Sequence, residues 1–409
     1  MHASRSPALD AGSSTASPAA RLARAFAENF ERWKGLRLRV HVGCLLVLAL
    51  VPVVRWWPTV SETVVPLGDE VEYFAAFEHV VEGRSPFAED NYLYPSAFAY
   101  AGAWSLELLG RTTTDVLLRA INLLGLAVAI WCSMAWLPWS ASRRLLAGVA
   151  FILVAPQVSY SVLFNNFSLA VAGMLLGGLL LASRRSIAAG LLLGGSVALK
   201  PIAPMAVGCL LFAHRETRER HLRWAAVVAI IVAAALILPD PHLDELLALT
   251  ADTERVAASI TLHRFPQLFG FEPNALWISV PLALVAVALI ATRRLGRARL
   301  LCLAVTASVA VTPLVWSHTL VVLLPLEVLA LAVAAKRWAA LRQRPSGVSR
   351  LPSWLEPVLV VLAVASIQLS SGAGSIGDQN VVLQLFGAGV PAVSPLALLA
   401  YLLVMTDAF

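Results

Sequence analysis

The segment Gly68–Tyr100, GDEVEYFAAFEHVVEGRSPFAEDNYLYPSAFAY, is the most polar part of an otherwise apolar chain, and the fold is organised around it. It follows the first strongly apolar run and contains adjacent carboxylates at Asp69 and Glu70. It ends in aromatic residues and a proline, of the kind that lie at a membrane surface. We therefore expect this segment just outside a bilayer, after the first membrane-crossing helix.

The remainder of the chain consists mainly of apolar runs. Of the 409 residues, 59% are hydrophobic and only 14% are charged, whereas roughly 25% of residues are charged in soluble globular proteins. Apolar runs separated by short polar segments recur from Val40 to Met405. Because these runs are continuous Leu, Ala and Val blocks without strand-like alternation, the sequence predicts an all-α, polytopic membrane bundle of about twelve spans.

The charged residues and cysteines restrict the classes of partner. The basic residues lie mostly in short clusters between apolar runs, as residues that orient membrane helices do, so the net charge of +6 indicates membrane lipids as partners and no nucleic acid. All four cysteines fall inside apolar runs, without the spacing of a metal site or disulfide.

Residues 1–39 differ from the rest of the chain. They begin with a stretch rich in Ser, Ala and Pro and continue into the strongly basic segment 21–39. We expect them to be disordered and cytoplasmic, and residues 40–409 to form one transmembrane catalytic domain. The first apolar run lacks a small-residue cleavage site and is interpreted as a retained anchor.

With the N-terminus inside, residues 58–118 form a first extracytoplasmic loop and residues 239–274 a second, and the C-terminus is cytoplasmic. Within the first loop, the run Ala97–Leu109 is too short, at about 1.5 Å per residue, to cross roughly 30 Å of hydrocarbon. We expect it to form a helix on the outer surface. The expected spans are 40–57, 119–137, 145–163, 169–181, 187–199, 202–212, 224–238, 276–291, 300–316, 320–335, 354–369 and 382–405.

This orientation places the main arginine clusters on the cytoplasmic side. Reading 97–109 as a full span would instead place Arg143 and Arg184 outside, against the charge bias. The same orientation brings several polar residues close to the outer face, namely Asp69, Asn165, Lys200, His263 and His318.

Four positions offer chemistry, each with a plain structural alternative. Asp69 could accept a proton from a substrate hydroxyl, or Asp69 and Glu70 could be a solvated acidic turn at a helix start. Lys200, in LLLGGSVALKPIAPM, and His318, in VTPLVWSHTLVVLLPLE, could neutralise a phosphate. Alternatively, the lysine snorkels to headgroups and the histidine pairs with a backbone carbonyl. Asn165 and Asn166 could orient hydroxyls or cap a helix starting at Ser168.

Further candidates come from the outer face. Arg111 and Arg119 lie there against the charge rule, which makes them secondary candidates for phosphate contact. Several aromatic residues are most simply an interfacial belt, although one of them could stack on a sugar: Trp56, Trp57, Tyr92, Tyr94, Tyr100 and Trp104. Walker, dinucleotide and HExxH motifs are not found.

Together these motifs resemble the GT-C class of membrane glycosyltransferases, and most closely glycosyltransferase family 87, the polyprenyl-phosphate-mannose-dependent mannosyltransferases. The resemblance rests on the first-loop pattern GDEVEYFAAFEHVVEGRSPF…YLYP, the pair NN at 165–166, ALKP at 198–201 and WSH at 316–318. These motifs are short, and their order along most of the chain carries more weight than any one of them. Ser96 and Asn165 depart from the family pattern and bear on the acceptor.

The resemblance implies roles for individual residues. Asp69 matches the family's first-loop catalytic aspartate, and Lys200 and His318 match positions associated with donor phosphate binding, to which we add Arg111 and Arg119. The residues expected to bind acceptor or sugar are Glu70, Tyr73, Tyr94, Asn165, Asn166, His263, Arg264 and Trp316.

The implied reaction is a single displacement by an acceptor hydroxyl that Asp69 deprotonates, with inversion at the anomeric carbon. The donor would be a polyprenyl-phosphate sugar, with mannose favoured, and the acceptor a glycolipid or glycan of the cell envelope. The expected location is a bacterial inner membrane, with the site on the extracytoplasmic side. A phosphate leaves as a stable anion, so we expect neither a metal ion nor another cofactor.

Two other classes of function remain open. A secondary transporter or a flippase for lipid-linked sugars would need polar groups near the bilayer midplane, often between two symmetric broken helices. The sequence shows one broken helix, near Pro201 and Pro204, and candidate residues at one face, which favours an enzyme. If the protein were a non-catalytic membrane scaffold, Asp69→Asn would have no effect on any glycan or glycolipid.

Overall fold

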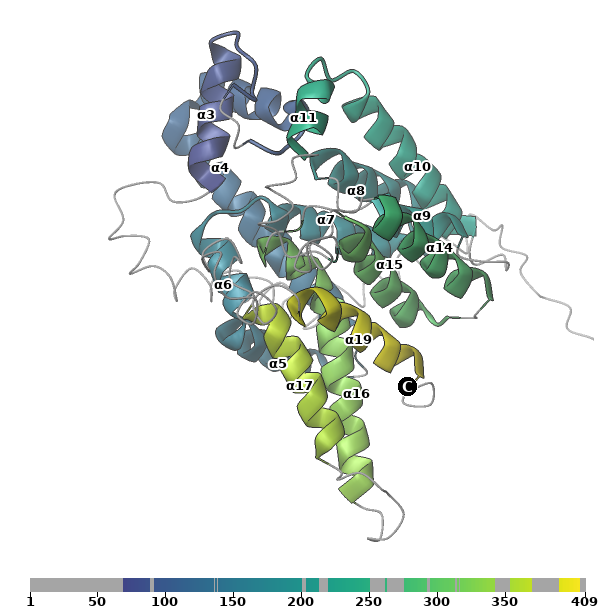
Figure 1. Cartoon of the computed structure of the whole chain (residues 1–409). Helices are drawn as coiled ribbons and strands as arrows, with labels where there is room; N and C mark the ends of the chain where they lie inside the picture. The colour runs from purple at the N-terminus through teal and green to yellow at the C-terminus, as the bar shows by residue number, and fades with distance from the viewer. Residues whose placement is uncertain are drawn as a thin grey trace, which may run out of the picture. The chain divides into compact units, whose positions relative to one another are not determined.

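A computed structural model describes residues 69–88, 92–135, 137, 139–200, 204–212, 220–250, 262, 276–292, 295–312, 315, 317–342, 354–369 and 390–404. Every regular element within these ranges is a helix (Figure 1). The predicted all-α fold is therefore confirmed. The elements are α3 (Asp69–Val81), α4 (Ser96–Ala135), α5 (Ala141–Val154), α6 (Pro156–Leu163), α7 (Ser168–Leu181), α8 (Ser186–Leu199), α9 (Pro204–Phe212), α10 (Arg220–Ile237), α11 (Leu243–Thr250), α14 (Leu276–Thr292), α15 (Arg297–Val311), η2 (Ser317–Leu323), α16 (Leu324–Arg342), α17 (Leu355–Gln368) and α19 (Val390–Val404).

Many of these helices are suited to a bilayer. Among the described residues, 3 helical stretches are long and apolar enough to cross it, namely Ser96–Ala135, Arg220–Ile237 and Thr319–Ala340. Six shorter apolar helices accompany them, and the helix count of about twelve stays a prediction. The N-terminal segment 1–39 and the first expected span lie outside the described residues.

Helix α4 contains both the helix expected at 97–109 and the span expected from Arg119, which the sequence predicted as separate helices. The expected surface helix 97–109 is present, and the backbone then leaves helical geometry at Gly110, with φ 75° and ψ 167°. This region of backbone space is essentially restricted to glycine. The helix resumes at once, so the span expected from Arg119 begins at Arg111 and runs about 37 Å to Ala135.

One expected span was wrong. The run 145–163 is not a single helix but two, α5 and α6, which are interrupted at Ala155. Ala155 has an extended backbone, with φ −92° and ψ 99°, because the proline ring of Pro156 disfavours helical geometry in the residue before it. Pro156 then starts α6, where its missing N–H would have no helical partner in any case.

Glycines allow the central helices to pack closely. A Cβ added to Gly125 of α4 would lie 2.5 Å from the Cα of Ala170 in α7, and one on Gly173 would lie 2.5 Å from the carbonyl oxygen of Gly125. Neither helix could approach the other this closely with larger residues at these positions. Helices α7 and α8 also pack together, and α10 packs on α8. The start of α7 is therefore held firmly against α4.

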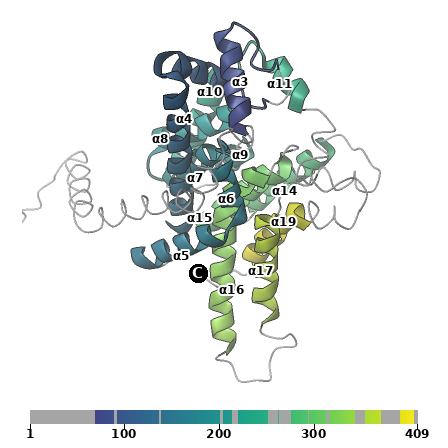
Figure 2. The same ribbon diagram turned by 90° about the vertical axis from the view of Figure 1, so that its left-hand side faces the viewer.

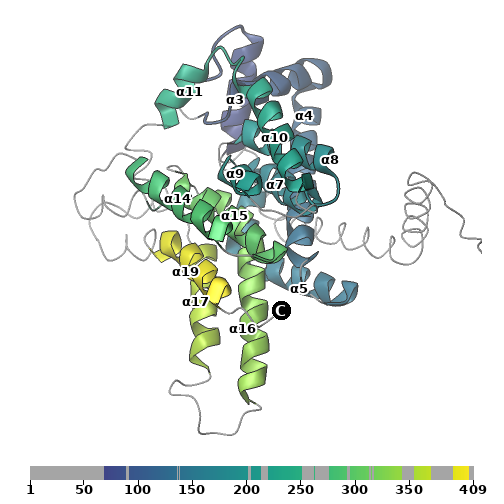
Figure 3. The same ribbon diagram turned by 90° about the vertical axis from the view of Figure 1, so that its right-hand side faces the viewer.

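The C-terminal helices form an antiparallel pair. Figures 1 and 3 show α16 and α17 side by side. Near one end of the pair, Gln368 Nε2 donates to Glu327 Oε2 at 2.7 Å, and near the other Arg337 Nε donates to Glu356 Oε1 at 2.5 Å. These two contacts fix the register of the pair.

The two predicted outer loops contact each other. Helix α11 lies within the second loop, and Figure 2 shows it close to α3 of the first. Ser85 Oγ donates to Glu245 Oε2 at 2.6 Å, and the Ser96 backbone N–H donates to Asp240 Oδ2 at 2.9 Å. The second contact supplies a partner for the N–H at the first residue of α4.

Candidate active site

Helix α3 presents Asp69 at its first residue. Asp69, Glu70 and Glu72 occupy the first turn, where the helix dipole favours negative charge. Glu70, Tyr73, Phe74 and Phe77 are buried, and their spacing places them on one face of the helix. Because α3 packs on α4 along this face, the side of α3 that carries Asp69 and Tyr73 is fixed.

An aromatic cluster holds the tyrosine hydroxyls in place. The ring of Tyr73 lies edge-on to Tyr94, at 5.3 Å between centroids, and to Phe98, at 5.5 Å. Phe98 lies 4.3 Å from Phe167 of the turn before α7. The Phe167 backbone N–H donates to Tyr73 Oη at 3.0 Å, so the cluster joins the first loop to the start of α7.

The burial of two tyrosines corrects a prediction. Tyr92 and Tyr94 are only 2% and 5% exposed, so they do not belong to an interfacial belt, and neither the Tyr73 ring nor the Tyr94 ring is open for a sugar to stack on. Tyr100 and Trp104, at 44% and 67% exposed, agree with the predicted belt. The sequence alone does not distinguish the buried tyrosines from the exposed aromatic residues, because both kinds occur in the same short stretch.

The Asp69 carboxylate is half-buried and is held by neutral donors. Asn166 Nδ2 donates to Asp69 Oδ2, and Tyr73 Oη lies 3.4 Å from the same oxygen. Burial raises the pKa of Asp69 above its ordinary value, whereas the charge of Lys200 and the contact with Tyr73 act in the opposite direction. A carboxylate in this setting can act as a base.

Asn166 has the helix-start role that the sequence offered, and it also contacts Asp69. Its Oδ1 accepts from the Ser168 backbone N–H at 2.8 Å, at the start of α7. This contact identifies the oxygen of the amide, so the nitrogen is the atom that faces Asp69. Asn166 thus satisfies a helix N-terminal donor and holds the carboxylate at the same time.

Lys200 ends α8 and points into the same cluster. Its Nζ donates to Ser168 Oγ at 2.5 Å and to Tyr94 Oη at 3.2 Å, and it lies 4.9 Å from the centroid of the Tyr94 ring. The side chain is 9% exposed, so it does not snorkel to headgroups. Burial lowers the pKa of Lys200 to about 8, against the charge of Asp69, which raises it.

The tyrosines connect Lys200 to Asp69. Tyr94 Oη lies 3.0 Å from Tyr73 Oη, and either hydroxyl can donate to the other. Burial raises the pKa of both phenols well above the usual range, so both stay protonated. A chain of hydrogen bonds therefore runs from the ammonium through the two hydroxyls to the carboxylate.

Glu70 lies in a different setting, although it adjoins Asp69. Arg119 of α4 donates through Nη2 to Glu70 Oε2, and through Nε to both oxygens of Asp115 at 3.0 and 3.1 Å. Burial and the hydrogen bond with Asp115 raise the pKa of Glu70 to about 7, and the charge of Arg119 opposes this rise. Two carboxylates thus share one guanidinium, which ties α3 to α4.

The predicted arginine candidates are already engaged. Arg119 has the two carboxylate partners just described, and Arg111 donates to Glu78 at 2.6 Å and lies 4.8 Å from the centroid of the Phe74 ring. Both arginines join α4 to α3, and phosphate binding by either stays a prediction. His318 lies in η2, but its side chain is outside the described residues, as are His263, Arg264 and Trp316.

Two residues of the cluster were missed by sequence reasoning. Ser168 contacts Lys200, and Asn122 of α4 donates to Asn165 at its carbonyl oxygen (3.1 Å) and at Oδ1 (2.7 Å). Asn122 interrupts an apolar span, and polar residues in such positions commonly have a function, so a signal was present. Ser168 carried none, because serine is ordinary at a helix start.

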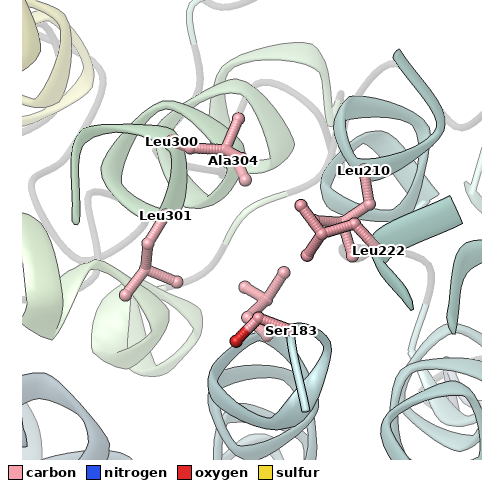
Figure 4. A pocket seen from close by; sticks show the side chains of 7 residues that line it. Ser183, Leu210, Leu222, Leu300, Leu301 and Ala304 are labelled. Atoms are coloured by element: carbon pink, nitrogen blue, oxygen red, sulfur yellow. The ribbon is translucent and has the colours of Figure 1, made fainter. Parts of the chain in front are cut away.

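The small pocket in Figure 4 is not part of this site. It is lined mainly by leucines from α9, α10, α15 and the end of α7, with Ser183 at its edge. Asp69 and Lys200 lie near the start of α7, which is about 20 Å away along that helix. Among the described residues, no group of three or more His, Cys, Asp or Glu side chains is placed to hold a metal ion.

Comparisons with known proteins bear on the identity of the chain. The model of glycosyltransferase family 87 matches residues 92–317, more than half of the chain, including Asn166 and Lys200. Asp69 lies before the matched region and His318 just beyond it. No curated protein matches the chain.

A solved structure gives a weaker likeness. The crystal structure of ArnT from Cupriavidus metallidurans in the apo state aligns over 90% of this chain and 77% of that chain, with 15% identity and a TM-score of 0.38. The family match, with the apolar helices, confirms the predicted GT-C resemblance: the chain belongs to glycosyltransferase family 87 and is an integral membrane glycosyltransferase.

Proposed function

We propose that this enzyme transfers a sugar, with mannose favoured, from a polyprenyl-phosphate donor to a glycolipid or glycan at the extracytoplasmic membrane face. The observation that carries this proposal is the joining of Asp69, Asn166, Tyr73, Tyr94 and Lys200 in one hydrogen-bonded cluster. It brings a half-buried base and a buried cation together, and a displacement at a sugar phosphate needs both.

The reaction is a single displacement. Asp69 accepts the proton of the acceptor hydroxyl while the hydroxyl oxygen attacks the anomeric carbon. The bond from this carbon to the phosphate oxygen breaks, and its electron pair leaves with the polyprenyl phosphate. Lys200 offsets the charge that develops on that oxygen, and His318 is the second candidate for this role. One displacement inverts the anomeric centre, and the reaction needs no metal ion or other cofactor.

The position of the cluster supports a lipid-linked donor. Lys200 ends α8 and Ser168 begins α7, so both lie at helix ends and not in the middle of a span. A donor anchored in the bilayer by its tail would bring its phosphate to this depth. We place this end on the extracytoplasmic side of a bacterial inner membrane, with both termini cytoplasmic, because that orientation leaves the arginine clusters inside.

The position of the cluster also favours an enzyme over a transporter or flippase. Transport by alternating access uses polar sites near the bilayer midplane, whereas the polar cluster lies at helix ends. Incorporation into nanodiscs with polyprenyl-phosphate mannose and a candidate acceptor, followed by measurement of polyprenyl phosphate release, tests the proposal. Release that depends on the acceptor supports transfer. Movement of intact donor between leaflets without release would support the flippase.

A further inference from the structure

We propose that Asn122 is a positioning residue for the base, acting on Asp69 through Asn165 and Asn166. This inference rests on the proposed function, because it assumes that Asp69 is the base. It adds a residue of α4 that lies just beyond the predicted first loop and contacts the turn before α7.

The contact of Asn122 with Asn165 is buried and double. One nitrogen, Asn122 Nδ2, donates both to the carbonyl oxygen of Asn165 and to its side-chain oxygen. Asn122 and Asn165 are 2% and 3% exposed, so water does not compete for these bonds. The contact holds the backbone and the side chain of one turn residue at once.

The turn that is held in this way has an unusual backbone. Asn165 has φ 47° and is the one non-glycine residue with positive φ among the residues that the structure describes. The left-handed region costs most residues roughly 1–2 kcal/mol, and asparagine tolerates it better than others. The turn is therefore sensitive both to the residue at 165 and to the partner that holds it.

Asn166 transmits the position of the turn to Asp69. Its backbone N–H donates to the Ser161 carbonyl at 3.0 Å, its Oδ1 accepts from Ser168, and its Nδ2 donates to Asp69. With the backbone and the oxygen both fixed, the nitrogen can point in only one direction. A shift of the turn would therefore move the donor away from the carboxylate.

Helix α4 is suited to hold this turn. Gly125, one turn of helix beyond Asn122, lies on the close contact with Ala170 and Gly173 of α7. The backbones of α4 and α7 thus meet next to the asparagine pair, which leaves little room for Asn122 to move. The position of Asn122 relative to α7 is fixed by the backbone and does not depend on flexible side chains.

The test measures the acid limb of the pH profile of kcat/KM, which reports the base in the free enzyme. A hydrogen bond from Asn166 to the charged carboxylate lowers its pKa, so weakening that bond raises the pKa. We expect Asn122→Ala to move the acid limb to higher pH by about one unit, a tenfold loss of kcat/KM below the limb. KM for the donor should change little, because Lys200 is not touched.

A matched control separates this effect from general destabilisation. Ser133 is also buried on α4 and donates to the Ala129 carbonyl at 2.7 Å, about 16 Å along the helix from Asn122. Ser133→Ala should keep the wild-type acid limb even if its melting temperature falls. An acid limb that moves equally in both variants would overturn the proposal.

The turn itself supplies a second test that does not require Asn122 variants to fold. Glycine accepts positive φ freely and alanine does not, so Asn165→Gly should keep an acid limb closer to wild type than Asn165→Ala. Equal limbs in these two variants would count against the proposal. If Asp69→Asn is inactive but Asn122→Ala has the wild-type limb, only this inference fails; if Asp69→Asn is fully active, the proposed function fails with it.

Discussion

Asp69 and Glu70 are neighbours in the sequence, yet their carboxylates have opposite partners. Asp69 is held by the Asn166 amide and the Tyr73 phenol, and Lys200 is linked to it through the hydroxyls of Tyr94 and Tyr73. Glu70 is paired directly with the guanidinium of Arg119. The charge of Arg119 lowers the proton affinity of Glu70, whereas Asp69 has no cation in direct contact among the described residues, which favours Asp69 as the proposed base.

Arg119 and Lys200 differ in a similar way, because Arg119 pairs with carboxylates and Lys200 with hydroxyls. Arg119 is shared by two carboxylates and ties α3 to α4, while Lys200 donates to the hydroxyls of Tyr94 and Ser168. Hydroxyl partners stabilise an ammonium without cancelling its charge. The comparison therefore supports the proposed roles of Asp69 and Lys200, and it shows that Glu70 and Arg119 join α3 to α4.

The largest effect is expected at Asp69, and Glu70 serves as its control. Asp69→Asn should lower turnover by about 10²–10⁴-fold, the range for removing a general base. Glu70→Gln, its adjacent control, keeps an acceptor oxygen for Arg119 and should lower turnover far less. Polyprenyl phosphate release measures both. A dead Glu70→Gln beside an active Asp69→Asn would move the base by one residue and reverse the comparison.

The next largest effect is expected at Lys200. Lys200→Met removes the cation that we propose for the leaving phosphate, and we expect about 10²–10³-fold lower turnover. Lys336→Met is a suitable control because Lys336 is an exposed lysine on α16. Single-turnover rates at saturating donor report the loss. Equal rates for the two variants would show that Lys200 does not act on the leaving group.

The pH profile sharpens the comparison further. Asp69 must be ionised and Lys200 charged, so activity should fall at acid pH and again above the Lys200 pKa of about 8. Lys200→Arg should shift the alkaline limb upward, because a guanidinium keeps its charge. Donor phosphate offsets the Lys200 charge that lowers the Asp69 pKa, so the acid limb of kcat should lie at higher pH than that of kcat/KM. Coincident acid limbs would argue against this coupling.

The smallest effects concern stability. Arg119→Gln leaves Glu70 buried without its cation and should cost about 1–3 kcal/mol of unfolding free energy. Arg111→Gln breaks a half-exposed pair with Glu78 and should cost less than about 0.5 kcal/mol. Thermal unfolding in detergent compares them. Equal losses would mean that Glu70 does not depend on Arg119.

The pH dependence of the unfolding free energy also tests the pairing of Glu70 with Arg119. The pKa of Glu70 rises from 4.5 to about 7 on folding, so within this window the folded protein holds a proton that the unfolded chain has released. Its contribution to stability therefore falls as pH rises through the window. This fall should be absent in Glu70→Gln and should extend to higher pH in Arg119→Gln, because loss of the Arg119 charge raises the Glu70 pKa further.

Much of the fold could be predicted because its signals are local. The apolar runs gave α7, α8, α14 and α17 nearly to the residue, since a membrane helix needs only length and composition. The break at Pro156 also had a local signal that the expected span 145–163 passed over. The extent of α4 could not be read in this way, because Gly110 departs from helical geometry without ending the helix.

Site residues could be predicted where a charged residue lies beside or inside an apolar run. An acidic pair beside an apolar run and a lysine inside one both stand out, and the structure brings Asp69 and Lys200 into one cluster. The pairing of Glu70 with Arg119 and of Asn122 with Asn165 depends on how α3, α4 and α7 are packed, which no single stretch of sequence specifies.

The backbone at Gly110 has a consequence for the two parts of α4. The part of α4 before this residue carries Phe98 of the aromatic cluster, and the part after it carries Arg119 and Asn122. A single pair of torsion angles thus sets the angle between the aromatic cluster and the helix that contacts Glu70 and Asn165. Any residue at position 110 that does not adopt these angles would therefore displace one set of contacts relative to the other.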